Sequence, residues 1–167
     1  MGAQTHITKD RILELLDYVK DPEIPVINVL ELGVVRGVEV DEESGRAVVT
    51  ITPTYTGCPA MDVMAADIRK ELLEAGVPEV EVKMSLSPAW TTDWITDTGK
   101  RKLKEYGIAP PEKTADIRAL KGEDPVVECP QCGSKDTMML SPFGSTACKA
   151  LWKCNDCLEP FDQFKCL

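Results

Sequence analysis

The sequence of 167 residues has little of what several large classes of protein require. Its single histidine, His6, precedes the first predicted helix, which argues against Ser–His and Cys–His catalytic relays and against most histidine-bearing metal sites. No GxxxxGK(S/T) or GxGxxG motif indicates a nucleotide site. No apolar run approaches the ~20 residues that span a bilayer, and the N-terminus has no apolar signal-peptide region. We therefore expect a soluble, cytoplasmic protein with no membrane partner.

Positive charge is also scarce. The 28 Asp and Glu residues outnumber the 19 Lys and Arg residues, which gives a net charge of −9. The Lys and Arg residues form no cluster that could override this balance, so the surface repels nucleic acids and we expect no nucleic-acid partner. Hydrophobic residues make up 43% of the chain, which is enough to build a core and argues against a disordered chain.

Residues 1–106 show the pattern of a small α+β domain. The order α-β-β-α-β predicts two helices on one face of a mixed sheet, because a hairpin makes the first two strands antiparallel and a helical crossover returns the third strand parallel. Thr8 is the predicted N-cap of the first helix, and Asp21-Pro22 is its stop signal. The expected elements are helices over about 9–19 and 59–75, strands over 33–40, 47–52 and 80–86, and a short third helix toward Tyr106.

The rest of the chain divides into a linker and a second, smaller domain. Residues 107–125 are polar and punctuated by proline, which is typical of a linker. Residues 126–167 are too few to form a good core alone, so they require a covalent or metal staple. We therefore predict a first domain over 1–106, a linker over 107–125 and a metal-stapled domain over 126–167.

The cysteines supply that staple. Two CxxC motifs, Cys129/Cys132 and Cys154/Cys157, are separated by 21 residues. Each CxxC turn directs two thiolates toward one point, and four thiolates match the tetrahedral preference of zinc, which predicts a zinc ribbon. Iron or an iron–sulfur cluster on the same ligands stays an alternative, because cysteine spacing does not separate them. Free reduced cysteines would leave this segment without a core, and a closed zinc site of this kind is structural.

Cys58 is a candidate of a different kind. It ends the segment Thr54-Tyr55-Thr56-Gly57-Cys58, immediately before Pro59, which suits the first turn of a helix. A helix N-terminus carries partial positive charge and favours a thiolate, which could attack a substrate or bind a metal. The alternative is a small buried cysteine that fills a loop. Asp21 and Glu23 flank Pro22, and their spacing alone favours ordinary polar residues around a helix stop.

Two further cysteines, Cys148 and Cys166, are left over from the four-ligand site. Residues 148–154 are predicted to form a strand that leads into the second CxxC turn, so Cys148 lies roughly 20 Å from Cys154 and cannot share its metal. If residues 161–166 return antiparallel, Cys148 lies opposite Cys166 or one position away, as a thiol pair or a second, transient metal site. The alternative is that both are small apolar residues packed against Trp152 and Phe164.

Several motifs together resemble a known family. These are Asp21-Pro22-Glu23, Val29-Leu30-Glu31-Leu32-Gly33, Thr54-x-x-x-Cys58-Pro59 and Pro88-x-Trp90. They are similar to the metal–sulfur cluster biosynthetic family, the small α+β domain of SUF-linked assembly factors. With the CPQCG and CNDC motifs added, about residues 8–167 resemble the PaaD (PaaJ) family of the bacterial phenylacetyl-CoA epoxidase, or ring 1,2-oxygenase, system.

The resemblance implies an accessory role in aerobic phenylacetate degradation. It implies a maturation factor, outside the catalytic core, that inserts or repairs an iron–sulfur cluster or another metal centre. The expected partners are the phenylacetyl-CoA oxygenase subunits, above all the iron–sulfur flavoprotein reductase, and a homodimer stays open. Cys58 corresponds to the family's reactive or cluster-binding position, which would hold iron or a cluster transiently, supported by Asp21, Glu23 and Thr54. The alternatives are a structural oxygenase subunit and a thiol-redox protein that uses Cys58.

Overall fold

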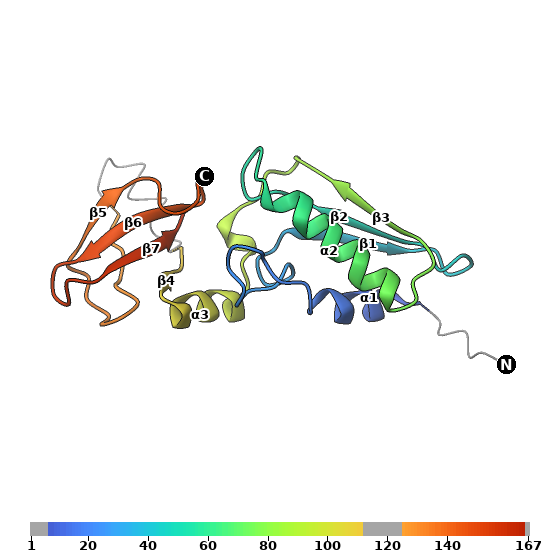
Figure 1. The fold of residues 1–167 in the computed structure, drawn as a ribbon, viewed down its shortest axis with the longest axis horizontal. Coiled ribbons are helices and arrows are strands. Elements are labelled where there is room, and N and C mark those ends of the chain that lie inside the picture. The colour runs from blue at the N-terminus through green and yellow to red at the C-terminus, as the bar shows by residue number, and fades with distance from the viewer. Residues whose placement is uncertain (1–6, 112–124, 166–167) are drawn as a thin grey trace. The chain divides into compact units, whose positions relative to one another are not determined.

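The structure, a computed structural model, describes residues 7–111 and 125–165. The chain divides into two compact units, Met1–Trp90 and Thr91–Leu167 (Figure 1). No helix among the described residues is both long enough and apolar enough to cross a membrane. Each unit has its own sheet, and we describe the two units separately.

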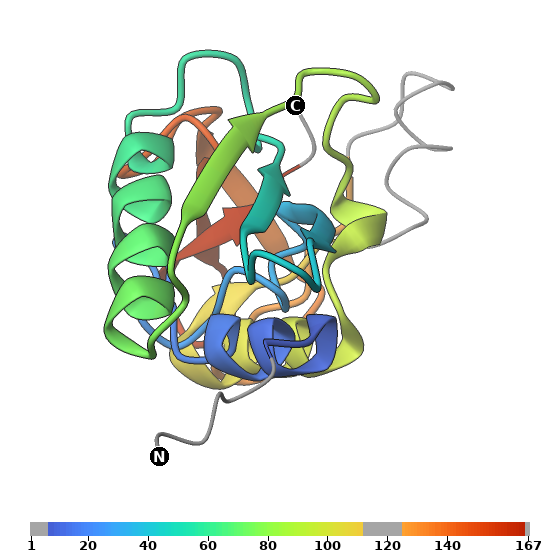
Figure 2. The ribbon, with the colours of Figure 1, turned by 90° about the vertical axis from the view of Figure 1, so that its right-hand side faces the viewer.

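The first unit has the predicted α-β-β-α-β order. Its sheet has the strand order β1-β2-β3, in which β1 and β2 are antiparallel and β2 and β3 are parallel. Figures 1 and 2 show α2 running alongside β3, and the two elements are in contact. The elements are α1 (Lys9–Leu16), β1 (Val35–Val40), β2 (Ala47–Ile51), α2 (Ala60–Glu74) and β3 (Val80–Met84).

The first helix begins as predicted and ends earlier. Thr8 caps α1, and its hydroxyl accepts a hydrogen bond from the backbone N–H of Arg11 at 3.2 Å. The helix ends at Leu16 because the following residues pair with a distant segment instead. The Asn28 amide donates to Asp17 Oδ1 at 2.6 Å, and the backbone N–H of Val29 donates to the carbonyl of Val19 at 3.0 Å. This tertiary pairing replaces the last turn that apolar spacing predicted.

The core of the first unit lies between its helices and its sheet. The two helices pack against each other, α1 also contacts β1, and α2 also contacts β3. Apolar side chains at helical spacing on α2 and at alternate positions on β2 are fully buried, which is what their periodicity predicts. The largest buried side chains of these elements are Ile12, Leu16, Ile51, Met64, Ile68 and Leu72.

The second unit is built around a four-stranded sheet. Its strand order is β4-β7-β6-β5, with β6 antiparallel to both of its neighbours and β4 parallel to β7. Two short helical elements precede the sheet in the chain. The elements are η1 (Thr92–Trp94), α3 (Asp97–Tyr106), β4 (Ile108–Ala109), β5 (Thr137–Ser141), β6 (Lys149–Cys154) and β7 (Pro160–Phe164).

The units divide after Trp90, whereas the sequence places the end of the first domain after residue 106. Ile108 and Ala109, expected in the linker, form β4 and pair with Asp162 and Gln163 of β7. Ala109 is buried in the same core cluster as Trp152. β4 is therefore part of the ribbon. The polar composition of the surrounding residues does not reveal this, because it gives no sign that Ala109 is buried. The greater part of the predicted linker, residues 112–124, lies outside the described residues.

Candidate metal centre and candidate thiol site

The two CxxC turns bring four thiols together in the second unit. The sulfur atoms of Cys129, Cys132, Cys154 and Cys157 all lie within 4.8 Å of one another. The Sγ atoms of Cys129 and Cys157 are 3.7 Å apart, and those of Cys132 and Cys154 are 3.6 Å apart. In a tetrahedral site with Zn–S bonds of ~2.3 Å, the sulfurs lie about 3.8 Å from one another. The donor set and its spacing therefore fit one tetrahedrally bound metal ion, which would stabilise the fold.

Both turns have the same backbone design, and we call residues 129–134 the first knuckle and 154–159 the second. In each, the N–H of the first cysteine donates to the carbonyl five residues later, Cys129 to Ser134 at 2.8 Å and Cys154 to Glu159 at 3.0 Å. The residue after the second cysteine has a positive φ in both, 76° at Gly133 and 65° at Leu158. Glycine adopts this conformation without strain, whereas Leu158 adopts it with a side chain.

The thiols differ in exposure and in proton affinity. Cys129 and Cys154 are buried, Cys157 is half-buried and Cys132 is exposed. The backbone N–H groups of Cys157 and Asp156 lower the pKa of Cys154 to about 7. The backbone N–H of Glu159 lowers the pKa of Cys157, but burial and the neighbouring thiols outweigh it and raise this pKa to about 12. Because the ligand form of cysteine is the thiolate, metal binding has to displace the thiol protons of the cluster.

Polar side chains that the sequence analysis missed join the two knuckles. Asn155 and Asp156, the two residues inside the second CxxC turn, form hydrogen bonds with Asp136 and Ser134, which follow the first turn. The sequence offered one sign of these hydrogen bonds. The second turn, CNDC, has two short polar residues between its cysteines, whereas the first turn, CPQC, has proline and glutamine. Their partners could not be read from spacing, because they lie about twenty residues apart in the chain.

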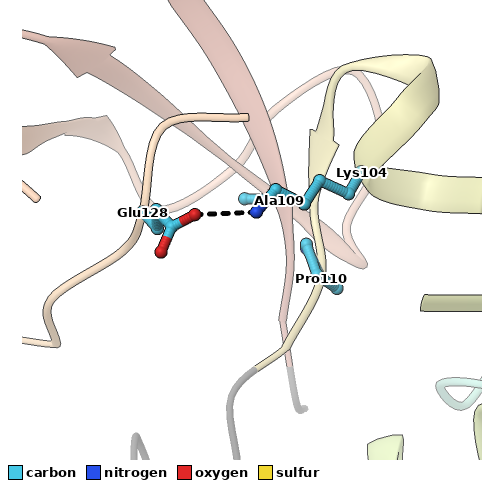
Figure 3. A pocket seen from close by; sticks show the side chains of 4 residues that line it. All are labelled: Lys104, Ala109, Pro110 and Glu128. Atoms are coloured by element: carbon cyan, nitrogen blue, oxygen red, sulfur yellow. Dashed lines mark hydrogen bonds and ion pairs between the residues drawn. The ribbon is translucent and has the colours of Figure 1, made fainter. Parts of the chain in front are cut away.

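An ion pair fixes the residue that precedes the first knuckle. Lys104 Nζ of α3 lies 2.7 Å from Glu128 Oε1 (Figure 3), and the hydrogen bond from Lys104 lowers the pKa of Glu128. Both residues line a hollow of about 70 Å³ with Ala109 and Pro110. Pockets that bind small molecules are larger, roughly 300–1,000 Å³. The pair therefore ties α3 to the segment that leads into the first knuckle, and the hollow beside it is smaller than such pockets.

Cys148 is separate from the four-thiol cluster. Its side chain is buried, and its Sγ lies 3.0 Å from Thr146 Oγ1. The ladder between β6 and β7 pairs Lys149 with Phe164, and the N–H of Lys165 donates to the Cys148 carbonyl at 3.0 Å. Cys166 lies outside the described residues, so its pairing with Cys148 stays a prediction.

Cys58 lies in the loop between β2 and α2 of the first unit. Its N–H donates to the carbonyl of Tyr55, and its own carbonyl accepts from the N–H of Met61, both at 3.3 Å. The helix α2 begins at Ala60, with Pro59 as its N-cap residue, so Cys58 lies one residue further from the helix than the sequence predicted by placing Pro59 in the first turn. Cys58 is half-buried and Thr54 is buried. The loop therefore holds a partly accessible thiol, and its reactivity stays a prediction.

Asp21 has a local structural role. It is buried, and its Oδ1 accepts hydrogen bonds from the backbone N–H groups of Glu23 at 2.8 Å and Ile24 at 2.7 Å, which fixes the turn after Pro22. Asp21 also lines a groove along the second half of α2. Cys58 and Glu23 do not line this groove, and a role for Asp21 and Glu23 beside Cys58 stays a prediction. The groove measures about 340 Å³, and its lining from α2 consists of Asp67, Lys70, Glu71 and Glu74.

Comparisons with known proteins agree with this two-part architecture. Residues 9–84 match the family model described as iron-sulfur cluster assembly protein, and residues 113–165 match that of the PaaD zinc beta ribbon domain. The chain is 46% identical over 156 residues to an Escherichia coli protein named as a putative subunit of 1,2-phenylacetyl-CoA epoxidase, covering 93% of this chain and 92% of that one. The chain belongs to the PaaD family.

The first unit of this PaaD-family chain also has relatives that lack the ribbon. An "Fe-S protein maturation auxiliary factor" of Porphyromonas gingivalis is 35% identical over 97 residues, which cover 58% of this chain and 90% of that protein. A crystal structure of a DUF59 domain from Bacillus anthracis is 31% identical, with a TM-score of 0.53, over 57% of this chain and 90% of that domain. The fold class predicted from the sequence, an α+β domain followed by a zinc ribbon, is confirmed.

Proposed function

We propose that this protein is an accessory maturation component of a phenylacetyl-CoA 1,2-epoxidase system in phenylacetate degradation. It assists the insertion of an iron–sulfur cluster or another metal centre into the oxygenase reductase and performs no step of the epoxidation itself. The observation that carries the proposal is the combination in one chain of an iron–sulfur assembly domain with a PaaD-type zinc ribbon, over almost the full length of the Escherichia coli epoxidase relative.

The two units have different tasks in this proposal. The four thiols of the ribbon have the closed geometry of a structural site, so zinc there holds the surface that docks on the client. Iron at this site stays an alternative. Cys58 is a single, partly accessible thiol at the start of a helix, and this arrangement suits a ligand that binds a metal or cluster transiently and lets it go. Thr54, Asp21 and Glu23 support it.

A maturation assay tests the role of Cys58. The chain is expressed together with the oxygenase and reductase, and the iron and acid-labile sulfide of the purified reductase are measured. We expect Cys58→Ser to deplete the reductase of both, because serine keeps the size of the side chain but is a poor ligand for iron. Thr56→Ser, a change at an exposed position of the same loop, is the matched control and should leave the reductase loaded.

The same assay separates the two rival functions. The name of the Escherichia coli relative, which describes it as part of the epoxidase, favours a structural role as the second candidate. A loaded reductase in a complex that dissociates when the ribbon cysteines are changed would support the structural role and reject maturation. A turnover catalysed by the isolated chain and abolished by alkylation of Cys58 would support a thiol-redox protein. A fully loaded reductase with normal turnover in Cys58→Ser would remove Cys58 from the proposal.

A further inference from the structure

Four polar side chains form a bridge between the two knuckles, and we call Ser134, Asp136, Asn155 and Asp156 the inter-knuckle clamp. The Ser134 hydroxyl donates to Asp156 Oδ2. The Asn155 side-chain amide donates to Asp136 Oδ1 at 2.7 Å, and its backbone N–H donates to the Asp136 carbonyl at 2.9 Å. The N–H of Asp136 donates to the Ser134 hydroxyl at 3.0 Å, so the four residues form one connected network.

The clamp lies close to the metal ligands in the chain. Ser134 is two residues after Cys132, and Asp156 is two residues after Cys154. The sulfur atoms of Cys132 and Cys154 come from different knuckles and lie 3.6 Å apart. The Ser134–Asp156 hydrogen bond therefore joins the two short segments that carry this pair of ligands.

The position of the clamp is unusual for a stabilising network. Asp136, Asn155 and Asp156 are exposed, and exposed hydrogen bonds contribute little to folding because water competes for both partners. Hydrogen bonds that hold the metal ligands in place act in another way, through the free energy of metal binding. Four thiolates repel one another as they approach one metal ion, and a device that holds them at the right spacing reduces the loss of freedom on binding.

We infer that Ser134, Asp136, Asn155 and Asp156 are positioning residues that hold the thiols of Cys132 and Cys154 in metal-binding geometry and slow the release of the ion. This inference rests on the proposed metal site. The clamp acts most strongly at Cys132, the exposed corner of the cluster, where an incoming chelator or client ligand has the easiest access.

The experiment uses the full chain loaded with Zn²⁺ or with Co²⁺. Release of Zn²⁺ to an excess of chelator is timed with a colorimetric indicator. The ligand-field bands of Co²⁺ report the geometry of the four thiolates, which a loss of stability elsewhere does not shift. Ser134→Ala removes the donor of the Ser134–Asp156 hydrogen bond, and Asp156→Ala removes its acceptor. Asp156→Asn keeps an acceptor oxygen. Ser145→Ala removes a serine hydroxyl that donates to Asp162 at 3.4 Å, away from the knuckles, and is the matched control.

We expect Ser134→Ala and Asp156→Ala to release Zn²⁺ roughly 10-fold faster and to shift the Co²⁺ bands, as removal of a group that orients a metal ligand typically does. The double variant should release no faster than Ser134→Ala, because Ser134→Ala already breaks the bond that Asp156→Ala removes. Asp156→Asn and Ser145→Ala should match the unchanged protein.

Unchanged release and spectra in both Ser134→Ala and Asp156→Ala would overturn the inference while leaving the metal site intact. Failure of the unchanged protein to bind one Co²⁺ through four thiolates would overturn the metal site and the inference together.

Discussion

At the scale of single residues, the two knuckles differ in how they accommodate a positive φ. A side chain with a Cβ costs about 1–2 kcal/mol in this conformation, and glycine costs nothing beyond its extra freedom in the unfolded chain. We expect Gly133→Ala to lower the unfolding free energy of the metal-loaded ribbon by about 1 kcal/mol. Leu158→Gly should change it by less than about 0.5 kcal/mol, because the relief of strain offsets the gain in unfolded-state freedom.

Denaturation of the zinc-loaded chain, followed in the second unit, measures both changes. The Leu158 side chain is 65% exposed, so its removal should forfeit little apolar burial. A cost of more than about 1 kcal/mol for Leu158→Gly would contradict this account, because it would mean that the side chain makes a contact that the strain argument ignores.

Trp90 connects two of the motifs on which the family resemblance depends. Its indole N–H donates to the carbonyl of Leu32 at 3.1 Å, and both residues are buried. We expect Trp90→Phe to lower the unfolding free energy of the first unit by about 1–3 kcal/mol, because it leaves a buried carbonyl without this donor. Urea denaturation measures the change, and Tyr18→Phe, at a position 72% exposed, should be silent. A cost within the error of the control would show that water replaces the indole.

The residue-scale predictions from the sequence succeeded where the cause is local. Thr8 as an N-cap follows from the preferences of a few neighbouring positions, and it is confirmed. The inter-knuckle clamp could not be found in this way, because Ser134 and Asp156 meet only after the strands between them have paired. Asp21 shows the same limit, since its neighbours across the groove are set by the packing of α2.

At the scale of elements, the hairpin between β1 and β2 has a built-in dependence on pH. The backbone N–H groups of Ser44 and Glu43 lower the pKa of Asp41 below its ordinary value of 3.8. The native state therefore binds this proton less readily than the unfolded chain does. The charge stabilises the native state above pH 3.8, and this contribution is lost as the pH falls through the lower, native pKa.

Substitution of Asp41 isolates this contribution. Asp41→Asn keeps an oxygen that can accept from Glu43 and Ser44 but has no proton to gain. We expect the unchanged protein to lose more unfolding free energy than Asp41→Asn between pH 7 and about pH 3, because only its turn is protonated in that interval. Urea denaturation at both pH values measures the difference. An equal loss in the two proteins would show that other carboxylates account for the whole acid response.

The strand β4 gives a second prediction at this scale. Ala109 is 2% exposed and lies in the ribbon core, so Ala109→Leu adds three carbons at a buried position and displaces the side chains packed around it. We expect a loss of about 1–3 kcal/mol in the stability of the second unit. The same change at the exposed Ala75, which caps α2, should cost little. If Ala109→Leu were as silent as Ala75→Leu in denaturation experiments, residue 109 would behave as part of a linker.

Elements were predictable from the sequence where their period was clear. The helix α2 and the alternating strand β3 were predicted within a few residues, and the antiparallel and parallel pairings of the first sheet are confirmed. The strands β4 and β5 were missed for a physical reason. Two residues show no period, and the three central residues of β5, Met138, Met139 and Leu140, are all apolar and exposed, so they do not alternate.

At the scale of the whole molecule, the sequence identified the two-part architecture but not the point of division. Composition separates a polar, proline-rich stretch from its neighbours, and it therefore predicted a boundary after residue 106. The compact units divide after Trp90 instead, because α3 contacts β4 and β4 pairs with β7 of the ribbon. Lys104 of α3 forms an ion pair with Glu128, and β4 pairs with β7. Both partners lie far along the chain, so composition near residue 106 does not reveal them.

This division determines what removal of the metal should do. The buried cluster that contains Cys129 and Cys154 has two large aromatic side chains, Trp152 and Phe161, among smaller residues, so we expect binding of the metal to supply much of the ribbon's folding free energy. Structural zinc contributes on the order of 10 kcal/mol or more in small domains. The first unit has its own core and no part in the metal site. We expect a chelator, or serine in place of any one of the four ligands, to unfold β5–β7 and leave β1–β3 and α2 folded.

Amide hydrogen exchange, read separately for the two sheets, is the measurement that checks this expectation. In the metal-free chain, the amides of β6 and β7 should lose their protection and those of β2 and α2 should keep it, and added zinc should restore the first set. Zinc binding weakens as the pH falls, because protons then compete for the four thiolates. Acidification toward pH 5 should therefore reproduce the effect of the chelator in the second unit alone. Parallel loss of protection in β1–β3 would show that the two units fold as one, and protected β6 and β7 amides without metal would show that the apolar core alone suffices.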